Sequence, residues 1–228
     1  MGLIWKLGKE SGIWETELRT GTELVTKRKL DNSNPNLDYF DAIVFANTTG
    51  ELQFDDEQKQ ALLSFVHDDG KGYVGMHSSV DGNYKWPEYA EMTGAYFDGH
   101  PWGLADNPIL VEDPTFPAVR HFPSAFLLRD DVYQFRNWTR DKVNVLMRMD
   151  ETKLDYTGKD KARSDHDFAI AWSKMYGKGR VFYSTIGHTA EVLADPDVQK
   201  MYQEAVKWVL GRTEGSTTSH PKTSVPIR

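Results

Sequence analysis

The sequence contains no cysteine. Disulfides, thiolate nucleophiles and sulfur-ligated metals are therefore excluded, so any metal site must be built from histidine and carboxylate side chains. Long runs of basic residues are also lacking, and the formal net charge is −7. A nucleic-acid or anionic-membrane partner would favour a clustered basic patch, so the sequence predicts neither kind of partner.

Long apolar runs are lacking as well. The first dozen residues are too short and too mixed for a signal peptide or a membrane span. As written, the chain is expected to be cytoplasmic. Two catalytic signatures are also missing: the metalloprotease pattern His-Glu-x-x-His and the hydrolase elbow Gly-x-Ser-x-Gly.

What the sequence does contain is enough for a large core. Of its 228 residues, 39% are apolar and 12% are aromatic, which excludes wholesale disorder. We expect one α/β domain over residues 1–212. The remaining residues, 213–228, are rich in serine, threonine and proline and are predicted to form a disordered tail.

The order of the predicted elements indicates a sheet with parallel strands. Residues 42–46 form a continuous apolar run, which is typical of a strand covered on both faces. An amphipathic helix over 56–69 follows, with Asp55 as its cap, and a buried strand over 73–76 comes next. Strand, helix and strand in this order imply right-handed parallel crossovers. The remaining predictions are helices at 3–11, 23–29 and 196–210 and strands at 14–20, 109–112, 126–135, 143–149, 168–172 and 180–186.

Three polar clusters, each with a histidine, follow strands or lie in loops. They contain His77 with Ser78, Ser79 and Asp81; Asp98 with His100; and His188 with Glu191. Because the carboxyl ends of parallel strands share one edge of a sheet, the first and third clusters should converge there.

Convergent histidines and carboxylates allow several interpretations. They can ligate a divalent metal such as zinc, with His77, His100 and His188 as ligands, or they can act as general acid and base. They can also simply hydrogen-bond one another in the core. A nucleophilic role for Ser78 or Ser79 is the least supported, because a serine after a strand more often caps a helix.

The aromatic residues near these clusters also have two interpretations. Packing over the sheet is the ordinary role of a tryptophan or tyrosine. The alternative is a platform on which a sugar stacks, and Trp86 and Trp102 are the best candidates because each lies beside a polar cluster.

Taken together, several segments resemble the ThuA-like (trehalose utilisation) family. The matching stretches are 39–45, 48–50, 75–78, 86–89, 94–101 and 179–189. The resemblance covers residues 37–211 and implies a flavodoxin-like three-layer sandwich with a mostly parallel sheet, as in class I glutamine amidotransferases, plus antiparallel additions. It places His77 where those enzymes carry a nucleophilic cysteine, so glutamine amidotransfer is not available to this chain.

The resemblance also implies a function. The protein is expected to act on a disaccharide such as trehalose, or on its 3-keto derivative, as a hydrolase-type or lyase-type enzyme. The alternatives are a non-catalytic sugar-binding accessory protein with a relict site, and a metal-dependent hydrolase of another substrate. The expected catalytic residues are His77, His188, Asp98, His100 and Glu191, and the expected substrate-binding residues are Thr49, Ser78, Asp81, Trp86 and Trp102.

The sequence departs from the family at its start. Relatives begin with a hydrophobic strand before the helix that corresponds to residues 3–11, and this strand is absent here. Its loss should leave unpaired backbone groups and a cavity, and it favours the accessory-protein alternative. A signal peptide upstream would make the protein periplasmic or secreted. Assembly into a homo-oligomer is compatible with the sequence.

Overall fold

The computed structural model describes residues 2–30 and 34–223. Five α-helices, four short 3₁₀ turns and eleven strands make up this part of the chain. They are α1 (Gly2–Ser11), η2 (Leu37–Tyr39), β1 (Ala42–Ala46), β2 (Thr49–Gly50), α2 (Asp56–His67), β3 (Gly72–Met76), η3 (His77–Val80), β4 (Asp81–Gly82), α3 (Pro87–Thr93), β5 (Tyr96–Phe97), β6 (Leu104–Val111), β7 (Ala125–Asp131), β8 (Phe135–Arg136), η4 (Arg140–Lys142), β9 (Asn144–Met149), η5 (Glu151–Lys153), β10 (Ala169–Tyr176), β11 (Gly179–Ser184), α4 (Ala190–Ala194) and α5 (Pro196–Val209).

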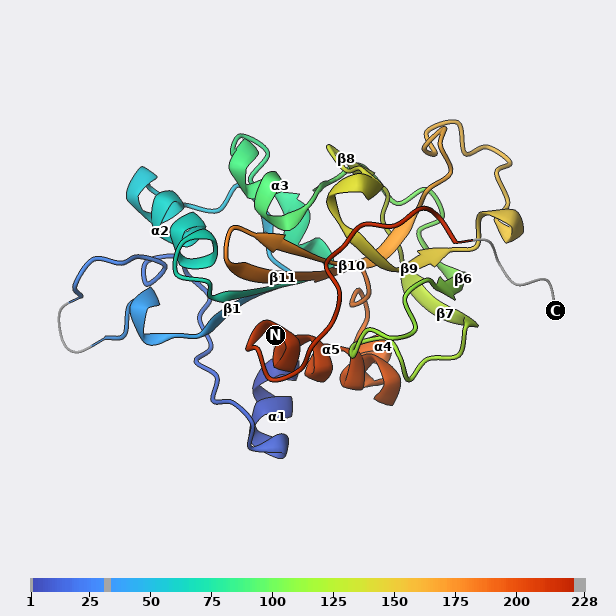
Figure 1. The fold of residues 1–228 in the computed structure, drawn as a ribbon. Helices are drawn as coiled ribbons and strands as arrows, with labels where there is room; N and C mark the ends of the chain where they lie inside the picture. Colours follow the sequence, from blue (N-terminus) through green and yellow to red (C-terminus); the bar gives the residue numbers. More distant parts are fainter. Residues whose placement is uncertain (1, 31–33, 224–228) are drawn as a thin grey trace.

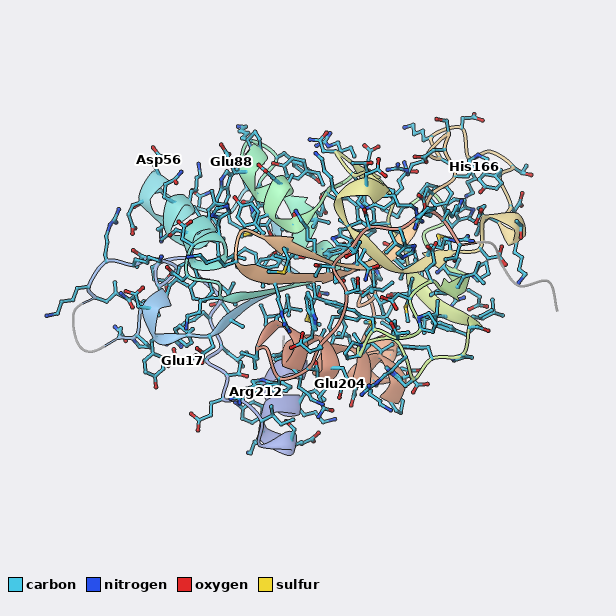
Figure 2. All side chains as sticks on the ribbon, in the orientation of Figure 1. Glu17, Asp56, Glu88, His166, Glu204 and Arg212 are labelled. Atoms are coloured by element: carbon cyan, nitrogen blue, oxygen red, sulfur yellow. The ribbon has the colours of Figure 1, made fainter. Side chains whose placement is uncertain are left out.

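A seven-stranded sheet, in the order β1-β3-β11-β10-β9-β6-β7, lies between two layers of helices (Figure 1). Helices α2 and α3 cover one face, where they pack against Tyr73 and Val181. Helices α1 and α5 cover the other face, where they pack against Val74 and Phe182. Side chains fill the space between the layers (Figure 2). The predicted α/β sandwich is confirmed.

The antiparallel part of the sheet is larger than expected. Strands β1, β3 and β11 pair in parallel. Strands β10, β9, β6 and β7 extend the sheet only through antiparallel pairs. Parallel pairing is confined to the first three strands and the predicted antiparallel additions make up the remainder, because tight turns such as the one between β10 and β11 can join only antiparallel neighbours.

The helix predicted over 56–69 is confirmed as α2. The Asp55 carboxylate accepts a hydrogen bond from the Gln58 backbone N–H at 2.8 Å, and the Gln58 side chain accepts one from the Asp55 N–H at 3.0 Å. This reciprocal capping box satisfies two N–H groups that the first helical turn leaves without partners. The helix ends at His67, and Gly70 follows it with a φ of 73°.

Two predictions near the start of the chain are wrong. Residues 14–20 form no strand and residues 23–29 form no helix. Alternation of polar and apolar residues makes a strand only where another strand can pair with it, and none of the described strands pairs with 14–20. The Trp14 indole N–H instead donates to the Thr16 hydroxyl within its own segment.

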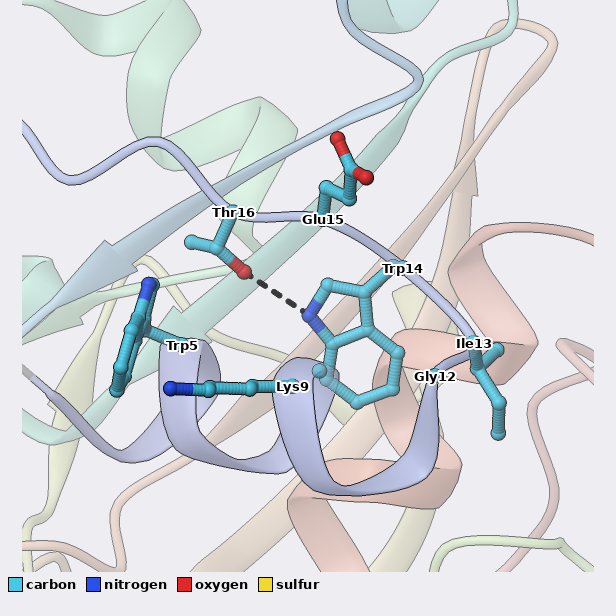
Figure 3. A pocket seen from close by; sticks show the side chains of 8 residues that line it. Trp5, Lys9, Gly12, Ile13, Trp14, Glu15 and Thr16 are labelled. Carbon is cyan, nitrogen blue, oxygen red and sulfur yellow. Dashed lines mark hydrogen bonds between the residues drawn. The ribbon is translucent and has the colours of Figure 1, made fainter.

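Strand β1 lies at the edge of the sheet. The Gly72 N–H donates to the Asp41 carbonyl and the Asn47 N–H to the Met76 carbonyl, so the odd-numbered residues of this segment face β3. The backbone groups of Ala42, Val44 and Ala46 face the other way, and no described strand pairs with them there. Separately, α1 and residues 12–16 enclose a hollow of about 590 Å³ lined by Trp5, Lys9 and Trp14 among others (Figure 3).

The C-terminal segment is not a disordered tail over residues 213–223. The Ser216 carbonyl accepts hydrogen bonds from the Asn144 amide and the Ser173 hydroxyl. Further along, His220 Nε2 donates to the Val145 carbonyl at 2.9 Å. The segment is therefore fixed across β9 and β10, because strand carbonyls and polar side chains there supply the partners that a tail would otherwise lack. Residues 224–228 lie outside the described part.

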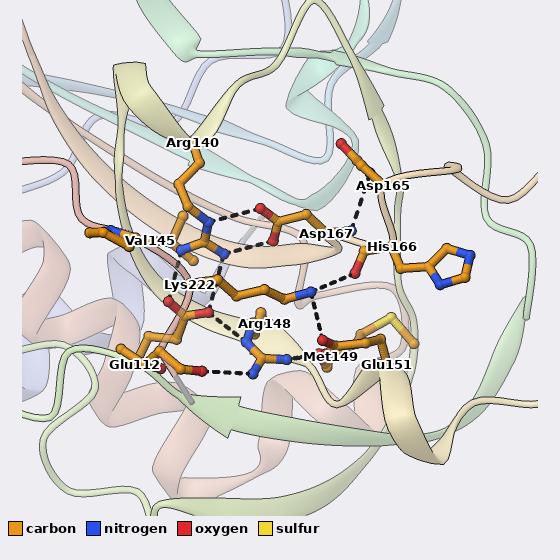
Figure 4. Close-up of polar contacts among 12 residues, drawn as sticks. Glu112, Arg140, Val145, Arg148, Met149, Glu151, Asp165, His166, Asp167 and Lys222 are labelled. Carbon is orange, nitrogen blue, oxygen red and sulfur yellow. Dashed lines mark hydrogen bonds and ion pairs between the residues drawn. The ribbon is translucent and has the colours of Figure 1, made fainter. Parts of the chain in front are cut away.

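A cluster of ions is buried where this segment crosses the sheet (Figure 4). The Glu112 carboxylate, whose side chain has no exposed surface, pairs with Arg140 at 2.8 Å and with Arg148 at 2.6 Å. Arg140 also pairs with Asp167 at 2.6 Å, and Lys222 reaches Glu151 at 2.6 Å. Buried charges are stable only when they are paired, so the cluster depends on each of its members.

Replacing Glu112 with glutamine should destabilise the protein by about 3–5 kcal/mol, because the charge that faces two buried guanidinium groups is lost. Urea unfolding at neutral pH measures this difference. A Glu10→Gln variant is the control, since Glu10 makes only an exposed 3.9 Å pair with Lys6 and should change stability by under about 1 kcal/mol. Equal stability of the Glu112→Gln variant and the parent would refute the prediction.

Lys174, in β10, has a side chain that is only 8% exposed, and its ammonium group donates to the Glu91 carbonyl. Burial lowers the pKa of this lysine to about 8, although the charge of Glu91 opposes the shift. Its charged form is therefore costly in the folded protein at neutral pH.

Replacing Lys174 with methionine should stabilise the protein at pH 7 by about 1–3 kcal/mol. The variant no longer buries a charge, and this gain exceeds the loss of the hydrogen bond to the Glu91 carbonyl. Between pH 8 and 10.5 the unfolded chain binds more protons at this lysine, so the parent gains stability as the pH rises. The advantage of the variant should then fade over this window in urea unfolding. A Lys6→Met control should show no such trend, and a constant advantage would contradict the explanation.

Candidate functional site

Two of the three predicted histidine clusters meet at the carboxyl ends of the parallel strands. His77 follows β3 directly, and His188 follows β11 after a short turn. Strand β7 ends beside them and brings Asp130 and Asp131. The expected convergence of the first and third clusters is confirmed, since His77 Nε2 and His188 Nδ1 are 3.2 Å apart.

His77 is held in an unusual conformation. It is 3% exposed and has a φ of 47°, in the left-handed region that a non-glycine residue rarely adopts. The Tyr183 hydroxyl donates to the His77 carbonyl at 2.7 Å, and His77 Nδ1 lies 2.7 Å from the Thr185 carbonyl. Strained backbone of this kind persists only where the surroundings enforce it, and it is concentrated at functional sites.

The hydrogen bonds of His77 fix its tautomer. A carbonyl oxygen can only accept, so Nδ1 carries the proton and donates it to Thr185. Burial lowers the pKa of His77 to about 4, the bond to Thr185 opposes this shift, and the nearby imidazoles of His188 and His100 add to it. At neutral pH the ring is therefore uncharged and its Nε2 offers a lone pair.

Three groups surround that lone pair. The Tyr133 hydroxyl lies 2.7 Å from His77 Nε2 and His188 Nδ1 lies 3.2 Å from it. The Asp131 carboxylate is 3.8 Å from His188 Nδ1. One ligand atom from each of His77, Asp131 and His188 lies within 4.8 Å of the other two.

Asp131 is a buried carboxylate with an incomplete set of partners. It is 6% exposed, and its Oδ1 accepts no hydrogen bond from the described residues. The imidazole nitrogen His100 Nδ1 lies 3.3 Å from Oδ1. Burial raises the pKa of Asp131, while His100 and His188 oppose that shift. A cation placed between this carboxylate and the two imidazoles would satisfy it, so the residues present fit a divalent metal.

The position of His188 is set by Asp130 and Asn47. The Asp130 carboxylate accepts from the backbone N–H groups of Gly187 at 2.7 Å and His188 at 3.1 Å. The Asn47 amide donates to the Gly187 carbonyl at 2.9 Å. Burial raises the pKa of Asp130, and these N–H groups pull it back down. The loop that carries His188 is thus tied to both β7 and the end of β1.

The expected third metal ligand needs correction. His100 is about half exposed and pairs with Asp131 rather than joining the three-residue group. Asp131 takes its place because β7 ends at the sheet edge, whereas His100 lies in a loop between Gly99 and Gly103. His100 Nδ1 lies 3.3 Å from the Asp131 carboxylate, a contact of the kind that outer partners make with metal ligands.

Glu191 and Asp98 do not orient the imidazoles. Both are exposed, and neither side chain makes a described hydrogen bond or ion pair with His77, His100 or His188. Glu191 lies in the first turn of α4, so its side chain projects from a helix that starts after His188. The acids that do contact the histidines are Asp130, at the His188 backbone N–H, and Asp131, beside His100 and His188.

Asp81, Thr49 and Ser78 lie near the centre with different surroundings. The Asp81 carboxylate accepts from the Tyr84 hydroxyl at 2.5 Å and from the Thr49 hydroxyl at 3.1 Å. Its charge contributes to the pKa of His77, so this group lies within electrostatic reach of the imidazole. Ser78 is half-buried in η3, a short turn that replaces the expected helix, and no described serine bonds to a His77 ring nitrogen.

The two tryptophans that were expected to form a sugar platform have different surroundings. Trp86 is 5% exposed and packs against Phe54 and Tyr89, so its ring is in the core and the expectation for it is wrong. Burying its apolar surface in the α2–α3 layer stabilises the fold more than leaving the ring exposed at a sugar site would. Trp102 is half-buried, donates to the Asp155 carbonyl at 2.9 Å and stands edge-on to Phe168.

Asp130 and Asp131 were missed from sequence, and Tyr133 was considered only as an aromatic for packing or for sugar stacking. They lie within a stretch predicted as one strand over 126–135, whereas β7 ends at Asp131. Two adjacent acids are unusual in a buried strand, and this was the signal that could have marked a strand end at the site.

An α/β sandwich with a histidine–aspartate–tyrosine centre at the carboxyl ends of its parallel strands defines the class of the protein. A family model described as trehalose utilisation, ThuA, matches residues 4–209, so the chain belongs to the ThuA family. No curated protein matches the chain.

Solved structures share the fold. A ThuA-like protein from Bacteroides uniformis superposes with a TM-score of 0.70 at 20% identity, covering 91% of this chain and 81% of that one. A ThuA-like protein from Parabacteroides merdae gives 0.69 at 14% identity, with 96% and 90% covered. A Salmonella typhimurium protein described as cytoplasmic gives 0.58 at 14% identity, with 91% and 85% covered. Within the described residues, no helix has both the length and the apolarity to cross a membrane.

The imidazole of His77 should remain neutral in metal-free protein when the pH is lowered to about 5, because its pKa is about 4. Nitrogen-15 NMR of the histidine rings, with a His77→Asn variant to assign the signal, should show a protonated Nδ1 and an unprotonated Nε2 throughout. Asparagine is the suitable replacement because it tolerates a positive φ. Protonation near pH 6.5, as in an exposed histidine, would contradict the burial argument.

Proposed function

We propose that the protein binds a disaccharide, trehalose or its 3-keto derivative, beside His77, Asp131 and His188, and processes it with a divalent metal such as zinc. The observation that carries the proposal is the convergence of one ligand atom from each of these residues within 4.8 Å. The family description, trehalose utilisation, supports the choice of substrate.

The chemistry of the three side chains supports a metal. Neutral imidazole nitrogens and a carboxylate are zinc ligands, and three protein ligands with an open position are typical of catalytic zinc sites. The tautomer of His77 is already correct, because Nδ1 is used by the Thr185 carbonyl and Nε2 points at the other ligands. A bound divalent cation supplies Lewis acidity for an oxygen of the sugar.

The surroundings of the centre support a polar, solvent-accessible ligand. His188 and His100 are each about half exposed, so a sugar can reach them. His100 Nδ1 lies 3.3 Å from Asp131 Oδ1 and the side chain is half exposed, so it is the imidazole best placed to exchange a proton with a sugar hydroxyl. Thr49 and Asp81 supply a hydroxyl and a carboxylate that can bind further sugar hydroxyls.

Zinc content and sugar binding test this proposal together. Chelator-dialysed parent protein, reloaded with zinc, should hold close to one equivalent by elemental analysis. His188→Ala and Asp131→Asn should each lower the zinc affinity at least about tenfold, because each removes a ligand. A His67→Ala variant, altered on the surface of α2, is the matched control and should retain zinc.

Isothermal titration with trehalose and with its 3-keto derivative should then show binding that depends on bound zinc. A folded parent that takes up no zinc would refute the metal part of the proposal. A zinc-loaded parent that binds neither sugar would refute the substrate. Binding of a sugar without its conversion would instead identify a non-catalytic sugar-binding protein.

A further inference from the structure

Tyr133 makes a hydrogen bond whose direction can be assigned. Its hydroxyl oxygen is 2.7 Å from His77 Nε2. Because His77 Nδ1 donates to the Thr185 carbonyl, Nε2 of the neutral ring has no proton to give. The tyrosine must therefore be the donor, and its hydrogen points at the lone pair that a metal at this centre would use.

The ring of Tyr133 is fixed while its hydroxyl hydrogen can rotate. The ring centroid lies 4.5 Å from that of His77 and 4.5 Å from that of Phe97. The Tyr133 backbone N–H donates to the Thr185 hydroxyl at 3.1 Å. A phenolic hydroxyl is a hydrogen-bond donor at neutral pH. A rigid ring with a retained proton is a preorganised donor.

A nitrogen lone pair that binds a cation cannot also accept a hydrogen bond. When a cation occupies Nε2, the Tyr133 hydroxyl loses its acceptor while the ring stays in place. A buried donor without a partner is costly, so it must turn to another acceptor at the same spot. Among the groups near His77, the cation would also engage His188 and Asp131. The Asp81 carboxylate already accepts hydrogen bonds from the Tyr84 and Thr49 hydroxyls. The acceptor left for the hydroxyl is an oxygen of the bound ligand.

We propose that Tyr133 is a substrate-binding residue that donates its hydrogen bond to a sugar oxygen, and that in the ligand-free protein it occupies His77 Nε2 instead. The inference rests on the proposed function. Tyr133 thereby couples the two binding events: it weakens metal binding slightly and strengthens sugar binding once the metal is in place.

A Tyr133→Phe variant separates this role from a structural one, because the two affinities should move in opposite directions. Zinc affinity, measured by competition with a chromophoric chelator, should rise about three- to tenfold, since Nε2 no longer accepts a hydrogen bond. Trehalose affinity of the zinc-loaded variant should fall by a similar factor. In the metal-free protein, the nitrogen-15 shift of His77 Nε2 should move toward that of an imidazole nitrogen without a hydrogen bond.

Tyr96→Phe is the matched control. The Tyr96 hydroxyl is also buried, but it donates to the Asn83 and Trp86 carbonyls. Its loss should lower stability without raising zinc affinity or shifting the His77 signal.

Zinc affinity that is unchanged or lower in Tyr133→Phe, in a parent that binds zinc and trehalose, would overturn the inference and leave the proposed function intact. So would an unchanged His77 Nε2 shift. A parent that binds neither zinc nor trehalose would overturn the proposed function, and this inference with it.

Discussion

The hydrogen bond between His77 Nδ1 and the Thr185 carbonyl organises the site. It joins the residue that follows β3 to the segment that follows β11, so it forms only when these two strands are paired in parallel register. It also decides which ring nitrogen is protonated, while burial lowers the pKa of His77 and leaves the ring uncharged at neutral pH. The contacts of the centre with Tyr133 and with His188 are both made at Nε2, the ring nitrogen that this bond leaves unprotonated.

The antiparallel half of the sheet supplies the remainder of the site. Strand β7 contributes Asp130, which fixes the His188 loop, and Asp131, which faces the imidazoles. Strands β6 and β9, which connect β7 to the parallel strands, are held by the buried pairs of Glu112 with Arg140 and Arg148. The C-terminal segment adds Lys222 to that cluster. Charge pairs on one side of the sheet thus maintain the strand order on which the histidine centre depends.

Strand β1 shows the opposite situation. One side of it pairs with β3, and on the other side the backbone groups of Ala42, Val44 and Ala46 meet no described strand. The site still has a contact with this edge, because Asn47, the residue after β1, holds the Gly187 carbonyl. An unpaired edge therefore lies next to one of the supports of the His188 loop.

The sequence determined the elements whose cause is local. The capping box at Asp55 and Gln58, the apolar runs of β1 and β3, and the turn between β10 and β11 are each readable from neighbouring residues. The family is readable as well, from segments such as 75–78 and 179–189, and with it the meeting of His77 and His188 at one edge of the sheet.

Tertiary structure decided everything that depends on partners distant in sequence. Residues 14–20 alternate like a strand but have nothing to pair with, and residues 213–223 look like a tail but find strand carbonyls. Asp131 and Tyr133 reach the centre only because an antiparallel strand ends there, and Trp86 is lost to it because burial of its ring outweighs exposure. Periodicity records which face of an element is apolar, but it does not record which other element will cover that face.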